Sequence, residues 1–246
     1  MINSRHVLPG MTAAQLRHVI HALRRSERHC GRPWASSLPR RVLVTCWHLR
    51  ANLTVRELAS VFAILKSQVH RIIVDITPRL AALLGGNLDR RWSWIVDGTL
   101  IPTRDHSTAA KSKNYRWSCN LQLLVRRADL RVIRIDGAGP GNRNDPVHYR
   151  RSAIEALCRR HRRVLADGGY RGIRELVTPR FHGRRILRNR TWRIHRRRRA
   201  RVEHAIARLK NWRSLRDHRR QGVHLLATAR AVAFLHNLQI TMRDSP

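Results

Sequence analysis

The chain has 246 residues, 42% of them hydrophobic, so it is long enough for one medium-sized domain with a real core plus a small accessory domain. Lysine and arginine total 51, of which 47 are arginine, against 15 acidic residues, and the formal net charge is +36. The apolar content excludes a wholly disordered chain, and the charge predicts a polyanion as partner. The alternatives are an RNA-binding surface of the ribosomal type and a compositional bias.

Cysteine usage and the chain ends suggest a compartment. Cys30, Cys46, Cys119 and Cys158 form no CxxC pair and no tight cluster with histidine, so neither a zinc site nor a disulfide framework is indicated. The segment MINSRHVLPGMT lacks the apolar stretch of a signal peptide, and no run approaches the roughly 20 apolar residues of a membrane span. We expect a reduced, soluble, cytoplasmic protein.

Helical patterns dominate residues 1–88. A short opening helix is predicted over Ala13–Arg25, and a second helical pattern runs from Leu38 to a break at Asn52. Pro78 and the pair Gly85-Gly86 are predicted to end this helical region before the first strand.

Two helices separated by a brief turn form a candidate DNA-binding element within residues 38–84. Thr54 with Glu57 is a capping box that begins a helix reaching about Phe62, and Lys66 or Ser67 begins the next. This is helix-turn-helix spacing, in which the first helix braces the second and polar side chains of the second enter a major groove. An ordinary three-helix bundle with a basic surface is the alternative, and the net charge favours DNA contact. The predicted contacts are Lys66, Ser67, Gln68, His70 and Arg71.

Two stretches end an apolar strand pattern in an aspartate. WSWIVDGT, Trp92–Thr99, predicts a buried strand that delivers Asp97 to its exposed end. VLADGGYRG, Val164–Gly172, repeats the pattern with Asp167 followed by two glycines, which let the backbone turn sharply and keep side chains away from the acid. Between these stretches, the β-like runs 119–125 and 130–136 predict two strands joined by a short turn.

The remaining pattern is mostly helical. Asp145, in the loop GAGPGNRNDP, is placed to cap a helix that reaches about His161. A weak strand signal follows at Arg185–Leu187, and Thr191–Arg213 predicts one long helix with Glu203 beside its apolar stripe. A final apolar helix, 225–240, is predicted to cover the sheet.

Three of these acids form a candidate metal site. Asp167 lies 70 residues after Asp97, and Glu203 lies 36 further on. If the two strands are neighbours and the helix packs across them, the three carboxylates converge. Two divalent ions about 3.5 to 4 Å apart, bridged by carboxylates, stabilise both oxygens of a phosphoryl transfer. The three residues are therefore candidate metal ligands and catalytic residues.

Each acid also has a simpler explanation. Glu203 can form an i, i+4 ion pair with Arg199, Asp97 can make an Asx turn at a strand end, and Asp167 can be a turn acid before two glycines. Arg199 and Lys210 lie within about 40° of Glu203 on a helical wheel. If Glu203 binds a metal ion, Arg199 and Lys210 lie on the same side of the helix and can bind the phosphates of the substrate.

The motifs VDGTLIPT, SKNYRWSCNLQ, PGNRND, LADGGYRG and RARVEHAIARLK occur in this order. The set resembles bacterial insertion-sequence DDE transposases of the IS-five type, which are related to Harbinger elements, over roughly residues 38–240. The family's arginine four before the glutamate and lysine seven after it match Arg199 and Lys210. Its tyrosine seven before the glutamate is Arg196 here.

The resemblance implies an α/β fold: an RNase H-like mixed-sheet catalytic domain, residues 89–246, preceded by a small all-α helix-turn-helix domain. It implies Asp97, Asp167 and Glu203 as ligands of two Mg²⁺ ions, with Mn²⁺ as an alternative. It also implies metal-dependent cleavage and strand transfer at the terminal inverted repeats of the element and at target DNA, by a homodimer or larger assembly associated with the bacterial nucleoid.

Several further residues have two explanations. Asp145 is either an accessory acid that touches metal or DNA or a plain helix cap, and the tract Arg196–Arg201 is predicted to contact phosphates. Trp117 and Trp212 can stack on an unpaired base, although packing is the more common role. A domesticated, catalytically inactive DNA-binding protein and an RNA-binding structural protein are the rival functions, and three costly clustered carboxylates argue against both.

Overall fold

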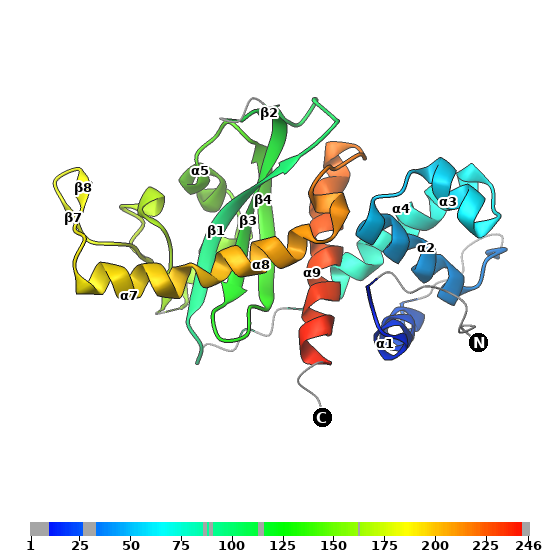
Figure 1. The fold of residues 1–246 in the computed structure, drawn as a ribbon, viewed down its shortest axis with the longest axis horizontal. Helices are drawn as coiled ribbons and strands as arrows, with labels where there is room; N and C mark the ends of the chain where they lie inside the picture. Colours follow the sequence, from blue (N-terminus) through cyan, green and yellow to red (C-terminus); the bar gives the residue numbers. More distant parts are fainter. Residues whose placement is uncertain are drawn as a thin grey trace.

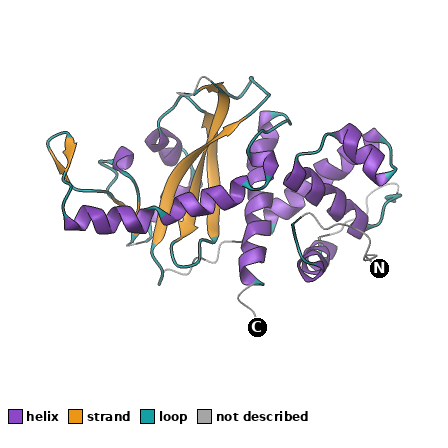
Figure 2. Ribbon diagram, viewed as in Figure 1, coloured by secondary structure: helices purple, strands orange, loops and turns teal. Residues whose placement is uncertain are grey.

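The computed structural model describes residues 10–26, 33–85, 88, 91–112, 116–161 and 163–242. In these ranges a group of helices precedes a mixed sheet, and later helices pack on the sheet (Figures 1 and 2). None of the described helices is both long and apolar enough to cross a membrane. Cys30, Gly86 and residues 113–115 of the SKNYRWSCNLQ motif lie outside the described residues.

The amino-terminal helices occur where the sequence predicts them. They are α1 (Ala13–Arg24), α2 (Leu38–Ala51), α3 (Val55–Phe62) and α4 (Lys66–Ala82). Asn52 ends α2 in the left-handed conformation, at φ 58°, which an asparagine tolerates better than most residues. At the start of α3 the Thr54 hydroxyl accepts from the Glu57 amide and the Glu57 carboxylate accepts from the Thr54 amide, so the predicted capping box is confirmed.

The prediction that Pro78 ends this helical region is wrong, since α4 continues through Pro78 to Ala82. A proline inside a helix leaves the carbonyl four residues earlier without its amide donor. That carbonyl belongs to Val74, and both Val74 and Pro78 are exposed, so water can satisfy it. The helix therefore tolerates the proline on its solvent face.

The sheet has six strands among the described residues, in the order β2-β3-β1-β5-β6, with β4 also paired to β3. β3 pairs antiparallel with β1, β2 and β4, whereas β5 is parallel to β1 and β6 is parallel to β5. The mixed α/β class is thus confirmed. The strands are β1 (Trp94–Pro102), β2 (Ala110–Lys111), β3 (Trp117–Arg126), β4 (Val132–Pro140), β5 (Val164–Leu165) and β6 (Leu176–Val177).

Two strand boundaries differ from the predictions. β1 does not end at Asp97 but continues to Pro102, because β3 pairs with it along its whole length, from Trp94 opposite Arg126 to Pro102 opposite Ser118. β4 likewise continues through the predicted loop to Pro140, since Cys119 of β3 lies opposite that residue. Pairing with a neighbouring strand overrides the weak strand preference of glycine and proline.

Helices cover both faces of the sheet. α5 (Asp145–Arg150) and α6 (Ala153–Arg159) pack over Val96 and Leu124, and they replace the single helix predicted to reach about His161. On the opposite face α8 (Arg201–Lys210) and α9 (Leu225–Thr241) pack over Ile95 and Leu123. Short 3₁₀ helices, η2 (Arg213–Leu215) and η3 (Gly222–His224), connect α8 to α9.

The long helix predicted over 191–213 is two helices in the structure. α7 (Arg190–Arg199) precedes α8 with Ala200 between them, and the two follow nearly one line across the sheet (Figure 1). The hairpin of β7 (Phe181–His182) and β8 (Arg185–Ile186) comes just before α7, which confirms the weak strand signal at 185–187. α7 and the hairpin project beyond the sheet, at the end of the molecule opposite α1–α4 (Figure 1).

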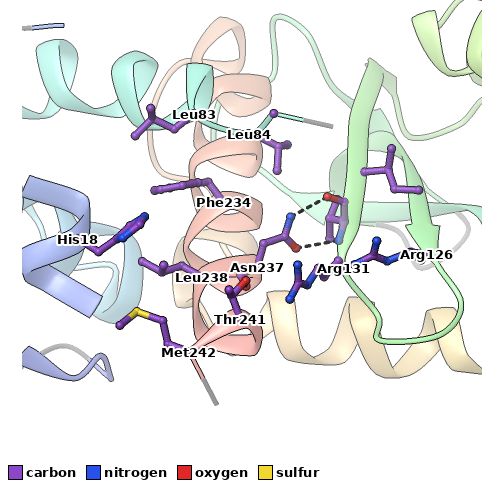
Figure 3. A pocket seen from close by; sticks show the side chains of 13 residues that line it. His18, Leu83, Leu84, Arg126, Arg131, Phe234, Asn237, Leu238, Thr241 and Met242 are labelled. Carbon is purple, nitrogen blue, oxygen red and sulfur yellow. Dashed lines mark hydrogen bonds between the residues drawn. The ribbon is translucent and has the colours of Figure 1, made fainter. Parts of the chain in front are cut away.

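Helix α9 joins the amino-terminal helices to the sheet. One buried apolar cluster includes Ile76 and Leu80 of α4, Leu235 of α9 and Leu123 of β3. Beside it lies a groove of about 380 Å³, which Figure 3 shows between α1, α9 and β4. There the Asn237 amide group both accepts from the Val132 backbone amide and donates to the Val132 carbonyl, each at 2.8 Å, which satisfies the outer edge of β4.

Candidate active site

Asp97 lies in the middle of β1 and its side chain faces α8. The residue retains only 9% of its surface, between the buried Ile95 and Ile101 on the same face of the strand. The sequence predicts a carboxylate at an exposed strand end, and that prediction is wrong about both place and exposure. Because β3 extends the pairing past this point, the carboxylate is held inside the sheet's helix-covered face.

Arg199 connects two of the three predicted acids. Its Nη1 donates to Asp97 Oδ2 at 3.0 Å, and its Nη2 donates to Glu203 Oε1 at 2.6 Å. The i, i+4 ion pair that the sequence offered as the simpler explanation for Glu203 is therefore present. It does not separate Glu203 from Asp97, however, since the same guanidinium brings both carboxylates together.

Asp167 follows β5 after one residue. Because β5 lies parallel to β1 with Ile95 opposite Leu165, Asp167 comes two residues beyond this pair on β5's side, as Asp97 does within β1. Asp167 is the N-cap of the short 3₁₀ helix η1 (Gly168–Tyr170), and its Oδ1 accepts from the Gly169 amide at 2.8 Å. Asp167 is thus a turn acid before two glycines, and it also follows the strand next to the one that carries Asp97.

Electrostatics shows that the acids influence one another. Burial raises the pKa of the Asp97 carboxyl to about 7, against the lowering effect of Arg199, and the carboxylates of Asp167 and Asp145 raise it further. Burial also raises the pKa of the Tyr170 hydroxyl, and the same three aspartates add to that rise. The three negative charges therefore act on one another. Asp97 and Asp145 nevertheless lie on opposite faces of the sheet, since Asp97 faces α8 and Asp145 meets Gly98 on the α5 face.

Asp145 belongs to this group through contacts that the sequence did not predict. It is the first residue of α5, and its carboxylate caps no helix. Instead its Oδ1 accepts a hydrogen bond from the side-chain amide of Asn120 at 2.6 Å and from the side-chain amide of Gln122 at 3.3 Å. The Tyr170 hydroxyl donates to Gln122 Oε1 at 2.6 Å, so this buried network fixes the carboxylate from behind.

Two glycines make room for these carboxylates. A Cβ at Gly98 would lie 2.0 Å from Asp145 Oδ1, and a Cβ at Gly169 would lie 3.0 Å from Asp167 Oδ1. Both glycines also line an open cavity of about 640 Å³. Together with Thr99, Leu100 and the loop from Gly141 to Pro146, they leave space beside the acids for part of a polymer substrate.

The sequence missed Asn120, Gln122 and Tyr170 as members of the site. The signal was present, because two amide side chains alternate along an otherwise apolar strand and a tyrosine follows the two glycines. All three are buried, and buried amides and hydroxyls require partners. Period-two polar residues in a buried strand therefore predict a polar network at the sheet surface.

The oxygen donors suit a hard divalent cation, although they are not yet arranged around one. Within the described parts of the chain, no three His, Cys, Asp or Glu side chains are grouped closely enough to hold a metal ion. Carboxylates are the ligands that Mg²⁺ prefers, and the side-chain-free positions at Gly98 and Gly169 leave space at two of them. The guanidinium of Arg199 supplies the positive charge between Asp97 and Glu203.

The other predicted site residues lie at two places. Lys210 is half-buried on α8, its ammonium donates to the Leu100 carbonyl at 3.1 Å, and burial lowers its pKa. The predicted DNA contacts lie on the first two turns of α4, a helix on the opposite side of α9 from β1 and α8 (Figure 1). Most of them are exposed and Gln68 is partly buried: Lys66, Ser67, Gln68, His70 and Arg71.

The two tryptophans differ. Trp212 retains 1% of its surface in the apolar core, so stacking on an unpaired base is excluded and the packing explanation is confirmed. Trp117, at the start of β3, stacks on the His106 ring at a centroid distance of 4.3 Å.

A mixed sheet with one aspartate inside a strand, a second just after the adjacent parallel strand, and a helical glutamate linked to the first through an arginine is typical of a class of nucleic-acid-processing folds. A family model described as "Transposase DDE domain" matches residues 91–238, more than half of the chain. The chain belongs to this transposase family, whose catalytic domain has an RNase H-like fold that the mixed sheet fits.

The chain is also similar to a protein of Streptomyces albus G named "Putative transposase for insertion sequence element IS112". The two are 38% identical over 241 residues, which cover 94% of this chain and 93% of that protein. Both comparisons support a bacterial insertion-sequence DDE transposase, as the resemblance implied.

Proposed function

We propose that the chain is a DNA transposase of the IS-five type that binds the terminal inverted repeats of its own insertion sequence and performs metal-dependent strand cleavage and strand transfer. One observation supports this most: Arg199 joins Asp97 to Glu203, while Asp167 follows the strand next to Asp97. This arrangement supports the proposal, because three acids that are far apart in the sequence come from two adjacent strands and from the helix that packs on the first of them.

Asp97, Asp167 and Glu203 are the proposed ligands of two Mg²⁺ ions, with Mn²⁺ as a substitute, and Asp145 is a proposed accessory acid. Bound ions would neutralise the charge that develops on the attacking and leaving oxygens. In the first reaction, water attacks a phosphodiester and leaves a 3′-hydroxyl at the element's end. In the second, that 3′-hydroxyl attacks a target phosphodiester in line, with no covalent enzyme intermediate.

The protein's own side chains have distinct proposed tasks. The Asn120–Gln122–Tyr170 network holds the Asp145 carboxylate against β1. Arg199 neutralises the acids before DNA arrives, and we propose that it then turns to a phosphate, so that the carboxylates become available to cations. Lys210 is the second proposed phosphate contact, and its release from the Leu100 carbonyl accompanies DNA binding.

The helices before the sheet have the proposed role of reading DNA. α3 and α4 are joined by residues 63–65, with Ala63 in the left-handed conformation, and this tight connection supports a helix-turn-helix. The exposed side chains of Lys66, Ser67, His70 and Arg71 on the first turns of α4 suit entry into a major groove. The proposed domains are residues 1–88, with the helix-turn-helix at about 38–84, and residues 89–246.

Assembly and location complete the proposal. Two element ends must be joined, so a homodimer or larger assembly on the bacterial nucleoid is expected, with target DNA as a second partner. The competing proposal is a domesticated, catalytically inactive DNA-binding protein. The acids favour catalysis over it, because burying Asp97 beside two more carboxylates has no value for DNA binding alone.

A nicking assay separates the two. The full-length protein is incubated with Mg²⁺ and duplex DNA that carries the terminal repeat of the element encoding it. We expect strand cleavage by the parent and a loss of at least about 100-fold for Asp97→Asn, Asp167→Asn and Glu203→Gln, with repeat binding retained. If Asp97→Asn cleaves as well as the parent, the catalytic assignment is wrong. Specific binding without cleavage by the parent supports the inactive alternative.

A further inference from the structure

Residues 178–198 form a basic projection, here called the arm, made of the β7–β8 hairpin and α7. The arm carries nine arginines and no acidic residue, and Figure 1 shows it extending beyond the sheet at the end opposite α1–α4. All nine side chains are exposed: Arg180, Arg184, Arg185, Arg188, Arg190, Arg193, Arg196, Arg197 and Arg198. A charge this dense on an extended surface needs a polyanion to offset its self-repulsion.

The arm is fixed to the protein beside the candidate active site. A Cβ at Gly168, which directly follows Asp167, would meet Phe181 and Ile186 of the hairpin at 3.2 and 3.3 Å, so the hairpin packs on that turn. In α7 the His195 Nε2 lies 2.9 Å from the carbonyl oxygen of Val177, the last residue of β6. The arm therefore extends outward from the acids and is held by packed contacts at its base.

One face of α7 is a row of arginines without internal partners. Arg190, Arg193 and Arg197 lie within about 60° of one another on the helix, and about 160° from the buried His195. Among the described residues, none of these three arginines forms a hydrogen bond or ion pair with another side chain. The row thus points away from the protein.

Two residues of the predicted phosphate-contacting tract, 196–201, contact the protein itself. Arg199 is engaged with Asp97 and Glu203, and Arg201 donates to the carbonyls of Arg127 and Ala128. Both face the protein. The surface available to a partner consists of the arm's outward arginines and ends where Arg199 meets the acids.

We propose that the arm binds the duplex that lies outside the element's terminal repeat, on the far side of the cleaved phosphodiester from the DNA read by α4. The inference rests on the proposed function, in which α4 holds the repeat and the acids act at its end. α4 and the arm lie at opposite ends of the molecule, with β1 and α8 between them (Figure 1). Since β1 carries Asp97 and α8 carries Glu203, DNA that continues past these acids meets the arm.

Sequence-independent contact is what this region of DNA requires. For an element that inserts at sites of different sequence, contacts to phosphates serve every flank, because phosphates are the same in every duplex whereas base edges are not. Exposed guanidiniums on a rigid helix bind phosphates by charge and by bidentate hydrogen bonds. The arm has these groups and no acid that would repel the backbone.

The test compares repeat duplexes that carry 0, 10 or 20 base pairs of unrelated flank. The triple variant Arg190→Gln, Arg193→Gln, Arg197→Gln removes the outward row. Its matched control, Arg17→Gln, Arg24→Gln, Arg25→Gln, removes two exposed arginines of α1 and the exposed arginine that follows it, and so lowers the net charge equally. Dissociation constants are measured at several salt concentrations with the full-length protein.

We expect the parent and the control to bind more tightly as the flank lengthens, and the arm variant to lose this gain while it binds the flank-free repeat as the parent does. Its salt dependence on flanked DNA should be shallower by about 2.7 in the log–log slope, at about 0.9 for each of three phosphate contacts. Equal flank dependence in the arm variant and the parent would overturn the inference, as would equal losses on flanked and flank-free DNA.

Two other outcomes separate the arm from the proposed function. If the arm variant binds every duplex normally but loses binding to single-stranded RNA of the same length, the partner assigned to the arm is wrong. If the parent shows no preference for repeat DNA at any flank length, both the proposed function and the placement of the flank fail.

Discussion

Replacing Arg199 with glutamine removes the guanidinium that joins the acids of the site. The side chains of Arg199 and Asp97 are 20% and 12% exposed, whereas Glu203 is 61% exposed. Breaking a buried ion pair by removing one partner costs about 3 to 5 kcal/mol, and an exposed i, i+4 pair contributes at most about 0.5 kcal/mol. We therefore expect Arg199→Gln to lower the free energy of unfolding by about 3 kcal/mol at pH 8, nearly all of it through Asp97.

The loss should depend on pH, because the charge of Asp97 does. The raised pKa of about 7 means that the folded protein holds the proton more tightly than the unfolded chain, where the ordinary value is 3.8. The contribution of Asp97 to stability is thus most favourable at low pH and is lost as pH rises through about 7. At pH 5.5 the carboxyl is mostly protonated, and we expect Arg199→Gln to cost only about 1 kcal/mol there, the value of a neutral hydrogen bond.

Urea denaturation followed by circular dichroism measures both values, in EDTA so that no divalent ion contributes. Arg197→Gln is the control, since it removes the same charge from an exposed position on α7. The reasoning is refuted if the two variants are equally stable at pH 8, or if Arg199→Gln loses the same free energy at both pH values.

The same variant tests the proposed metal site without an activity readout. If Arg199 and Mg²⁺ compete for the same carboxylates, Mg²⁺ should raise the thermal midpoint of Arg199→Gln more than that of Arg197→Gln. Each tenfold gain in affinity adds about 1.4 kcal/mol of stabilisation at saturating ion. Equal Mg²⁺ responses would count against competition for those oxygens.

Three other changes have defined outcomes. Gly98→Ala places a methyl group 2.0 Å from Asp145 Oδ1 and should destabilise the protein by about 1 to 3 kcal/mol, measured in urea, whereas a neutral effect would show that the carboxylate is free to move. Burial lowers the pKa of His48 and of His218 to about 4, so the free energy of unfolding should fall as pH drops from 6.5 to 4. His218→Gln should make that fall smaller in urea denaturation at several pH values. An unchanged pH profile would argue against a buried, neutral His218. Arg71→Ala should weaken binding to repeat DNA in a gel-shift titration but leave nicking of nonspecific DNA intact, and unchanged retention of repeat DNA would contradict the reading role of α4.

Local signals in the sequence were sufficient for most elements. The capping box of Thr54 and Glu57 specifies the start of α3, because both hydrogen bonds form within four residues. The order of the acids 97, 167 and 203, with the glycines after two of them, predicted neighbouring strands and a covering helix, and β1 and β5 are neighbours. Hydrophobic periodicity, helix caps and helix-breaking residues act over only a few positions, so they can be recognised in a single sequence.

What the sequence by itself determined was therefore the set of elements and the chemical type of the site. Only the tertiary structure decided that Asp97 is buried in mid-strand, that Asp145 contacts Asn120 rather than capping a helix, and that Arg199 lies between two acids. Each depends on the register of β3 against β1, on the packing of α5 on β3, or on the placement of α7 and α8 across the sheet, and these contacts join residues 25 to 102 positions apart. Contacts at such separations are set by how whole faces pack, and no local pattern in the chain encodes them.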